Sequence, residues 1–434
     1  MPLAFSSFSG SRSFGNTKRI FLISSTYSVT PAAGSVNEGS PITFNVTTTN
    51  VPNGTTLYWT INLSGSVTSG DFNATSGNFV INSNAGNFIV TPTADVTTEG
   101  AETFTVSIRT DNTSGTIVAT SSSTTINDTS TAPAIPTHGY FAGGRHSGFP
   151  PSGLISRITF ASDTSTAIFR GLLSGGRYDH AAVGTSTNVW YNGGVGPSFS
   201  PQETSRVDRI TFSSDSSTAS TRGPLVGGRY RHCSVGNNNY GWIAGGSTRP
   251  VPINSRIERI DFNDDTIMAS TRGNLNNALN AGAVSNDNYG WFGGGNDPGY
   301  TSRINRIDFA ADTGTPSIRG PLSLARSDLT AVEDSTYGWF AGGQATPAVT
   351  SVIDRITFSS DTTTASSRGK LNLARRNLAG SDNGTFGWFG GGLTSTFVSR
   401  VDRLTFSNDT SNASSRGPLD YSMRSHAGTE GVGS

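Results

Sequence analysis

The sequence has little cysteine, little charge and no long apolar run. Cys233 is the single cysteine in 434 residues, so no intrachain disulfide can form. Lysine plus arginine and aspartate plus glutamate number 30 each, which leaves no net charge to attract nucleic acid. No segment approaches the roughly 20 apolar residues of a membrane-spanning helix. We therefore expect no nucleic-acid partner and no membrane insertion.

Residues 1–26 lack the apolar core and the small-residue cleavage site of a secretory signal peptide. Coiled-coil heptads are also missing, so a homo-oligomer is left open without a sequence signal for a trimer. Charged residues make up only 14% of the chain, whereas glycines number 53. This composition is typical of short strands joined by tight turns. We predict an all-β fold with almost no helix.

A unit of about fifty residues repeats six times in 139–434. Each copy contains a double glycine after an aromatic segment, and the double glycines recur every 48 to 52 residues. Each copy divides by pattern into four short segments, which predicts four strands, and the third segment alternates with a period near two, which predicts a strand with one buried face. Such a sheet cannot bury both faces alone, so we expect six copies to stack as a six-bladed β-propeller. The double glycines are Gly143-Gly144, Gly193-Gly194, Gly245-Gly246, Gly294-Gly295, Gly342-Gly343 and Gly391-Gly392.

The two ends of this region each hold part of one copy. The first copy begins at its aromatic segment, which contains Tyr140, and lacks a first strand. The last copy is followed by a spare first strand at 425–431. We predict that this strand pairs with the one containing Tyr140, because the pairing removes an open sheet edge and closes the ring.

The double glycine, the alternating third strand and an arginine before the next copy resemble the kelch family over 139–434. The resemblance implies a kelch-like propeller. The fourth strand departs from the kelch pattern, because an Arg-Gly-x-Leu element replaces its tryptophan. We interpret the arginines of this element as structural residues that bond carbonyls between blades. They are Arg170, Arg222, Arg272, Arg319, Arg368 and Arg416.

Residues 27–129 contain alternating segments such as ITFNVTTT and predict a β-sandwich. VNEGSPITFNV at 36–46 and DVTTEGAETFTVSI at 95–108 resemble the Calx-β family. The resemblance implies a Ca²⁺ site, since this cation prefers several carboxylate and carbonyl oxygens. The alternative is that the same side chains only cap turns and edges. The matching positions are Glu38, Asp71, Asp95, Glu99, Glu102 and Asp128. Residues 130–138, with two prolines, are predicted to be a stiff linker.

We predict no catalytic residues, and no cofactor beyond the calcium that the Calx-β resemblance implies. Three histidines nevertheless share one position of the repeat, ten residues after an Arg-Gly-x-Leu arginine: His180, His232 and His426. If these imidazoles line one arc of the channel, they could hold a metal ion. The alternative is that they pack and form hydrogen bonds.

The loops after the double glycines differ sharply between copies, whereas the turns of the opposite face are nearly identical. A scaffold that varies one face is typical of a binding module, although ordinary loop drift gives the same pattern. Aromatic residues beside arginines on this face could stack on sugars or press on a protein. The predicted face comprises Phe149, Arg177, Tyr178, Phe199, Arg229, Tyr230, Arg231, Arg249, Tyr300, Arg375, Arg376 and Phe397.

A Calx-β-like sandwich followed by a degenerate propeller resembles virion structural proteins of tailed phages, particularly those of cyanobacterial phages. The resemblance implies a non-enzymatic virion protein, such as a tail fibre. Residues 1–26 would then dock to other virion proteins, and the propeller would bind a glycan or protein of the host surface. The alternatives are a capsid-attached fibre or decoration protein and a glycan-cleaving enzyme. A bacterial adhesin is disfavoured by the missing export signal.

Overall fold

The structure, a computed structural model, divides the chain into two compact units, Met1–Pro133 and Ala134–Ser434. Its described residues form strands and single-turn 3-10 helices, so the chain is all-β as the composition predicts. None of the helices in this part of the chain is long and apolar enough to cross a membrane. The described residues are 24–63, 65–94, 100–129, 135–146, 149–197, 202–248, 254–275, 280–296 and 298–431.

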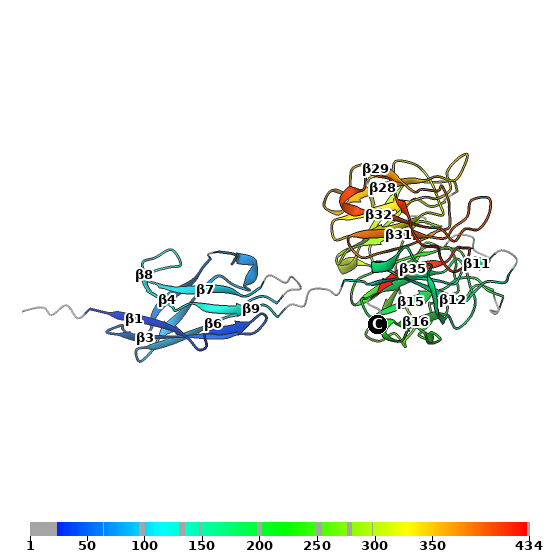
Figure 1. The fold of residues 1–434 in the computed structure, drawn as a ribbon. Coiled ribbons are helices and arrows are strands. Elements are labelled where there is room, and N and C mark those ends of the chain that lie inside the picture. The colour runs from blue at the N-terminus through cyan, green and yellow to red at the C-terminus, as the bar shows by residue number, and fades with distance from the viewer. Residues whose placement is uncertain are drawn as a thin grey trace, which may run out of the picture. The chain divides into compact units, whose positions relative to one another are not determined.

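The N-terminal unit consists of two sheets (Figure 1). Its strands are β1 (Thr26–Pro31), β2 (Ser35–Asn37), β3 (Ile42–Thr49), β4 (Thr55–Asn62), β5 (Ser76–Ile81), β6 (Ala85–Val90), β7 (Glu102–Arg109), β8 (Ile117–Thr120) and β9 (Thr124–Asn127), with a 3-10 helix η1 (Ser69–Asp71). One sheet has the order β1-β3-β6 and the other β2-β9-β7-β4-β5, with β8 paired to β7. Buried and exposed residues alternate along most of β3, as its sequence predicts.

Both sheets of this unit contribute to one apolar core. Trp59 of β4 stacks on Phe88 of β6, with ring centroids 5.0 Å apart. Phe44 of β3 and Phe104 of β7 also meet across the layers, at 6.0 Å. Aromatic pairs of this kind bury large areas, so they hold the two layers together.

Six four-stranded antiparallel sheets form most of the described part of the C-terminal unit. Their first strands are β14 (Ala181–Gly184), β18 (Cys233–Gly236), β22 (Gly282–Ser285), β26 (Thr330–Glu333), β30 (Ala379–Asp382) and β35 (Ala427–Gly431). The second strands are β15 (Asn188–Asn192), β19 (Tyr240–Ala244), β23 (Tyr289–Gly293), β27 (Tyr337–Ala341), β31 (Phe386–Gly390) and β10 (His138–Ala142).

The third strands each bury adjacent residues, and the fourth strands are short. The third strands are β16 (Val207–Thr211), β20 (Arg256–Asp261), β24 (Ile304–Asp308), β28 (Val352–Thr357), β32 (Val401–Thr405) and β12 (Leu154–Thr159). The fourth are β17 (Ser220–Thr221), β21 (Ser270–Asn274), β25 (Ser317–Arg319), β29 (Ser366–Lys370), β33 (Ser414–Ser415) and β13 (Ile168–Leu172). A 3-10 helix follows five third strands: η2 (Phe160–Ser162), η3 (Phe212–Ser214), η4 (Phe309–Ala311), η5 (Phe358–Ser360) and η6 (Phe406–Asn408).

The sheet that contains β10 takes its first strand from the far end of the chain. β35 pairs with β10 in antiparallel register, with Tyr140 opposite Thr429 and Ala142 opposite Ala427. In Figure 1 the red β35 lies beside teal strands from the start of the unit. A second short ladder joins β11 (Arg145–His146) to β34 (Met423–Arg424). The pairing predicted for 425–431 is therefore present.

Neighbouring sheets stack through an aromatic pair that recurs around the unit. Trp190 of β15 packs on Phe262 of the next sheet, with ring centroids 4.0 Å apart. The series returns to its start, because Trp388 of β31 packs on Phe160 of the first sheet at 3.8 Å. Each sheet thus covers the apolar face of its neighbour, which it could not bury alone.

The first strands contact one another in the cyclic order β14, β18, β22, β26, β30, β35 and β14. One residue shortly before each first strand adopts a left-handed conformation and donates its backbone N–H to the carbonyl of its equivalent in the preceding sheet. These hydrogen bonds form a complete cycle, since Ser425 donates to Asn377 and Asp179 donates to Ser425, both at 2.9 Å. We name the six positions the ring residues: Asp179, Arg231, Asn280, Asp328, Asn377 and Ser425.

Candidate functional site

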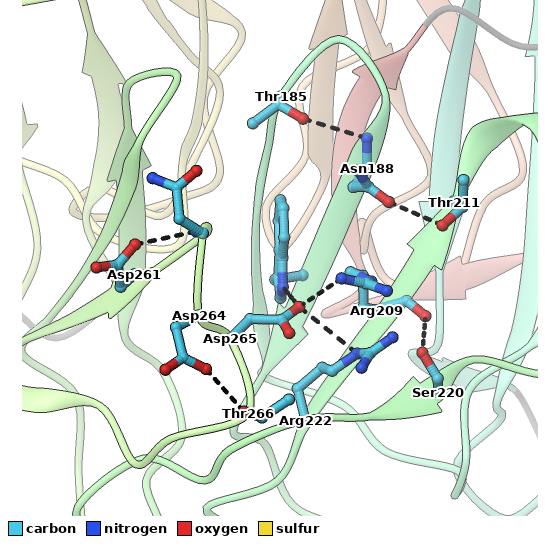
Figure 2. A network of polar contacts seen from close by, with 12 residues as sticks. Thr185, Asn188, Arg209, Thr211, Ser220, Arg222, Asp261, Asp264, Asp265 and Thr266 are labelled. Atoms are coloured by element: carbon cyan, nitrogen blue, oxygen red, sulfur yellow. Dashed lines mark hydrogen bonds and ion pairs between the residues drawn. The ribbon is translucent and has the colours of Figure 1, made fainter.

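An aspartate after the third strand of each sheet connects two neighbouring sheets. Asp265 accepts hydrogen bonds from Trp190 Nε1 at 2.7 Å and from Arg209 Nη1 at 2.9 Å, both in the preceding sheet. Arg222, an Arg-Gly-x-Leu arginine, lies 3.5 Å from the same carboxylate, as Figure 2 shows. Equivalent aspartates receive equivalent donors around the whole unit: Asp163, Asp215, Asp312, Asp361 and Asp409.

The Arg-Gly-x-Leu element is therefore a connector between sheets. Its arginine bonds a carboxylate, so the predicted bond to a carbonyl is wrong although the structural role holds. The glycine also has a role, because Gly223 donates its N–H to the carbonyl of Asp265 at 2.8 Å. A Cβ on Gly223 would lie 1.8 Å from the carbonyl oxygen of Ile267, so no other residue fits there.

We expect Asp265→Ala to destabilise the C-terminal unit. The substitution leaves Trp190 Nε1 buried without an acceptor and leaves two partly buried guanidinium groups without their carboxylate. The loss should lie near the lower end of the roughly 3–5 kcal/mol measured for broken buried ion pairs. Urea unfolding measures it. Asp264→Ala is the matched control, since Asp264 is exposed and accepts only from Thr266 Oγ1 in its own turn. Equal losses for the two variants would contradict the connecting role.

Three arginines predicted on the binding face are buried, and that part of the prediction is wrong. Arg177, Arg229 and Arg375 have 0% exposure, as does Arg326. Each guanidinium faces inward and pairs with a carboxylate of the third strand in its own sheet. The pairs are Arg177 with Asp208 at 2.9 Å, Arg326 with Asp354 at 2.8 Å, Arg375 with Asp402 at 2.6 Å, and Arg229 with Glu258.

The remaining residues of the predicted face fall into two groups. Tyr178, Tyr230, Arg231, Arg376 and Phe397 are exposed or half-buried, and Phe149 and Tyr300 are 73% and 38% exposed. Phe199 and Arg249 lie outside the described residues. Two arginines that the prediction omitted stack on this group: the Arg145 guanidinium lies 5.0 Å from the Tyr178 ring, and that of Arg424 lies 5.4 Å from the Phe397 ring.

A polar pocket of about 260 Å³ opens beside the ring residues. We call it the ring pocket. Five ring residues line it, namely Asp179, Arg231, Asn280, Asp328 and Asn377. The other lining residues are Asn296, Tyr300, Ser327, Arg376 and Arg424. The ring pocket therefore brings together three residues of the predicted face, Arg231, Tyr300 and Arg376, with seven that the sequence reasoning missed.

Phe149 belongs to a different pocket, of about 490 Å³ and mainly apolar. Its walls include His146, Phe149, Pro151 and Tyr421. The His146 and Tyr421 rings meet edge to face, with centroids 5.6 Å apart. This pocket offers aromatic faces but few hydrogen-bonding groups, so it differs chemically from the ring pocket.

The three histidines at one repeat position are buried beside the double glycines. His232 Nε2 lies 2.8 Å from Asn192 Oδ1 and 3.0 Å from the Asn192 carbonyl. A Cβ on the first glycine of the preceding pair would lie 2.5 Å from the imidazole of His180, His232 or His426. Burial lowers the pKa of His232 and of His426 to about 3, so both stay neutral at physiological pH. These contacts support the packing interpretation.

Three carboxylates gather where successive first strands end: Glu333 of β26, Asp382 of β30 and Glu430 of β35. Ser285 N and Oγ donate to Glu333 Oε1, and the Glu333 N–H donates to Asp382 Oδ2 at 3.0 Å. Burial, followed by repulsion from Glu430, raises the pKa of Glu333 from 4.5 to about 8. Burial raises the pKa of Glu430 from 4.5 to about 7, and burial with the same repulsion raises that of Asp382 well above 3.8.

We expect the C-terminal unit to lose stability as the pH rises from about 7 to 8. Below pH 6.5 the buried His180, His232 and His426, whose folded pKa values lie under 6.5, oppose this loss. The folded state keeps protons on Glu333 and Glu430 that the unfolded chain has released, because their folded pKa values, about 8 and about 7, exceed 4.5. The favourable contribution is complete below pH 4.5 and is lost as the pH passes through the folded values. Thermal unfolding across this range measures the effect. Glu430→Gln should flatten the pH dependence of the melting temperature. Asp287→Asn, the control at an exposed position, should leave that dependence unchanged. A melting temperature that does not change with pH in the wild-type chain would contradict the prediction.

The predicted calcium ligands of the N-terminal unit are only partly described. Asp71 caps η1, since its carboxylate accepts from Thr68 N at 2.6 Å and from Thr68 Oγ1 at 3.3 Å. Asp128 Oδ2 accepts from Gly100 N at 2.7 Å, and Glu102 is buried. Asp95 and Glu99 lie outside the described residues, and Glu38 lies just after β2. Within the described part of the chain, no group of three acidic, histidine or cysteine side chains could hold a metal ion. The calcium site stays a prediction.

Comparison with protein-family models gives no match for this chain, and comparison with curated proteins gives none either. The kelch, Calx-β and phage resemblances therefore depend on the quoted sequence motifs alone. Function has to be argued from the site geometry.

Proposed function

We propose that the C-terminal unit is a closed six-bladed, kelch-like β-propeller that serves as a binding module, preceded by a Calx-β-like β-sandwich. The cyclic contacts of the first strands, the recurring Trp–Phe stacks and the complete cycle of ring hydrogen bonds support the closed architecture. A propeller closed in this way has no exposed sheet edge at its seam. It can therefore present loops on a rigid frame.

One observation carries the binding role. The residues that connect the sheets are nearly the same in all six copies, whereas the ring residues carry aspartate, arginine, asparagine and serine side chains on one backbone geometry. Structural demands explain the constant residues but give no reason for the varied ones. Five of the varied side chains line the ring pocket. A pocket with convergent polar groups on a rigid frame is the usual form of a ligand site.

We further propose that the chain is a non-enzymatic structural protein of a virion, a tail fibre or similar appendage. Residues 1–26 would dock to other virion proteins, and the pocket-bearing face would contact the host surface. The support is the phage resemblance of the sequence together with the binding face. In this proposal the protein acts by adhesion, with no cofactor needed for its function.

Electron microscopy of particles of the virus that encodes the chain tests this proposal. Gold-labelled antibodies against the C-terminal unit should decorate the tail. Decoration of the capsid would favour the attached-fibre alternative, and particles without label would overturn the proposal.

In a second assay the purified chain is incubated with host envelope polysaccharide. Intact polysaccharide is the expected result, and released oligosaccharides would establish the enzyme alternative.

A further inference from the structure

The ring pocket contains one guanidinium more than it has carboxylates. Arg231 pairs with Asp179 at 3.3 Å, and Arg376 lies 3.9 Å from Asp328. No ion pair joins Arg424 to a carboxylate of the described residues, and its guanidinium instead lies over the Phe397 ring. The pocket thus holds three guanidinium groups against two carboxylates. Arg424 feels the charges of Asp179 and Asp328 but makes no ion pair with either of them. A planar guanidinium that has no carboxylate in direct contact can hold one through two parallel hydrogen bonds.

The remaining walls of the ring pocket suit hydroxyl groups. Asp328 accepts from Asn377 Nδ2 at 3.0 Å and from Ser327 Oγ at 3.3 Å, which fixes its carboxylate in place. The amides of Asn280 and Asn296 and the hydroxyl of Tyr300 add further donors and acceptors. The apolar anchors that a peptide side chain would need lie in the other pocket, beside Phe149.

The backbone at Arg231 supports a ligand role for this position. Its φ is 58°, in the left-handed region that asparagine, aspartate and glycine adopt most readily. Four of the six ring residues are asparagine or aspartate, as that geometry favours. An arginine there is strained by roughly 1–2 kcal/mol, and backbone strain of this kind clusters at ligand sites.

We propose that the ring pocket binds a carboxylate-bearing saccharide, with Arg424 holding the carboxylate and Asp328, Asn280 and Asn296 binding the sugar hydroxyls. The pocket volume of about 260 Å³ suits one sugar ring at the end of a longer glycan. This inference rests on the proposed binding role and names its ligand class. It predicts that the host ligand is an acidic glycan.

Ligand-observed NMR titration of the full-length chain tests the pocket. The probes are glucuronic, galacturonic and sialic acids, each beside its methyl ester, which keeps the hydroxyls and removes the charge. At least one acid should bind about tenfold or more tightly than its ester, because a charge-assisted contact is lost in the ester. If no acid binds, or if acids and esters bind equally, the proposal is overturned. Acetate binding as tightly as the best acid sugar would reduce the pocket to a plain anion site and would also overturn it.

Two variants locate the contact. Arg424→Gln should weaken the best acid probe by about tenfold or more and leave its ester unchanged. Lys370→Gln is the control, since it removes the same charge from an exposed position on β29. Arg376→Gln provides a second test should Arg424→Gln fail to fold, as shown by its unfolding curve. Retained binding in both pocket variants would contradict the assignment.

A cell-binding assay with the full-length chain distinguishes the pocket assignment from the adhesion proposal. Fluorescently labelled protein is added to host cells with and without the best acid probe. Cell binding that no acid sugar blocks would sink the pocket assignment and leave the adhesion proposal standing. Probe binding to a chain that ignores host cells would support the pocket and sink the adhesion proposal.

Discussion

Removing residues 425–434 should unfold the C-terminal unit while leaving the N-terminal unit folded. The deletion takes away β35 and the ring residue Ser425, so the edge of β10 loses every hydrogen bond of that ladder. It also uncovers Phe141, which is fully buried. Because the segment completes both a sheet and the cycle of ring hydrogen bonds, the loss should be of the order of the whole stability of a domain, about 5–15 kcal/mol. Calorimetry of the full-length and truncated chains measures it.

A point substitution gives the same test with less disturbance. Gly428 lies in β35, and a Cβ there would meet the carbonyl oxygen of Gly380 at 2.2 Å. Gly428→Ala should therefore lower the melting temperature of the C-terminal unit. Gly299→Ala is the matched control, because a Cβ at that glycine has no atom within 4 Å.

A peptide covering 425–434, added in excess to the truncated chain, should restore the unfolding transition of the C-terminal unit. A truncated chain that melts like the full-length one would refute the structural role of this strand.

Arg375→Met should cost about 3 kcal/mol, the lower end of the range for a broken buried ion pair, because the buried carboxylate of Asp402 keeps, among the described residues, only its contact with Arg400 Nε, at 2.9 Å. Arg375 and Asp402 are both 0% exposed, and their ion pair measures 2.6 Å. The guanidinium also donates to the carbonyls of Phe389 and Gly391, at 2.8 and 2.7 Å. Chemical denaturation measures the loss, and it should appear in the transition of the C-terminal unit.

The double variant Arg375→Met/Asp402→Ser should recover much of that loss. The sheet of β10 has Met423 at the arginine position and Ser156 at the carboxylate position, where Ser156 Oγ donates to Asp420. In the sequence of the third copy after it, Ala278 and Asn305 stand at the same two repeat positions, so arginine and its carboxylate partner are replaced together. Replacing a buried pair as a unit is often nearly neutral. A double variant no more stable than Arg375→Met would contradict the pairing argument.

Much of the C-terminal unit follows from repetition in the sequence. The number of double glycines gives the number of copies. The alternation of Ile257, Arg259 and Phe262 predicts third strands with one buried face; the strands are present, but that part of the prediction is wrong, because Ile257 and Ile260 are buried in two different apolar clusters. The missing first strand before Tyr140 and the spare one at 425–431 predict the β10–β35 pairing. The predictions of the strands and of this pairing succeed because they depend on short-range pattern and on the need of every sheet edge for a partner.

The partners of repeated polar residues could not be predicted in the same way. Arg222 and Asp265 are 43 residues apart along the chain, and a repeat pattern shows that both recur without showing that they meet. Arg375 was placed on the surface because it lies in a connection between strands, yet its side chain turns inward to Asp402. The direction of a side chain in an irregular segment depends on tertiary contacts that composition does not report.

The ring pocket has a weaker signal in the sequence, which is variation at a single position of the repeat. His180, His232 and His426 share one repeat position. The residues directly before them are Asp179, Arg231 and Ser425, which vary in charge at a position of constant backbone geometry. The sequence therefore shows variation at one aligned position. The prediction omitted Arg424 although it occupies the repeat position of Tyr178, Tyr230 and Arg376, which the predicted face includes.

Hydrogen–deuterium exchange of 427–431 tests most directly whether the end of the chain belongs to the first sheet of a closed ring. The amides of β35 should exchange as slowly as those of β14 and β18, because all three are inner strands paired on the same pattern. Exchange of this segment within seconds, while β14 and β18 stay protected, would contradict the closed architecture and the pocket that depends on it.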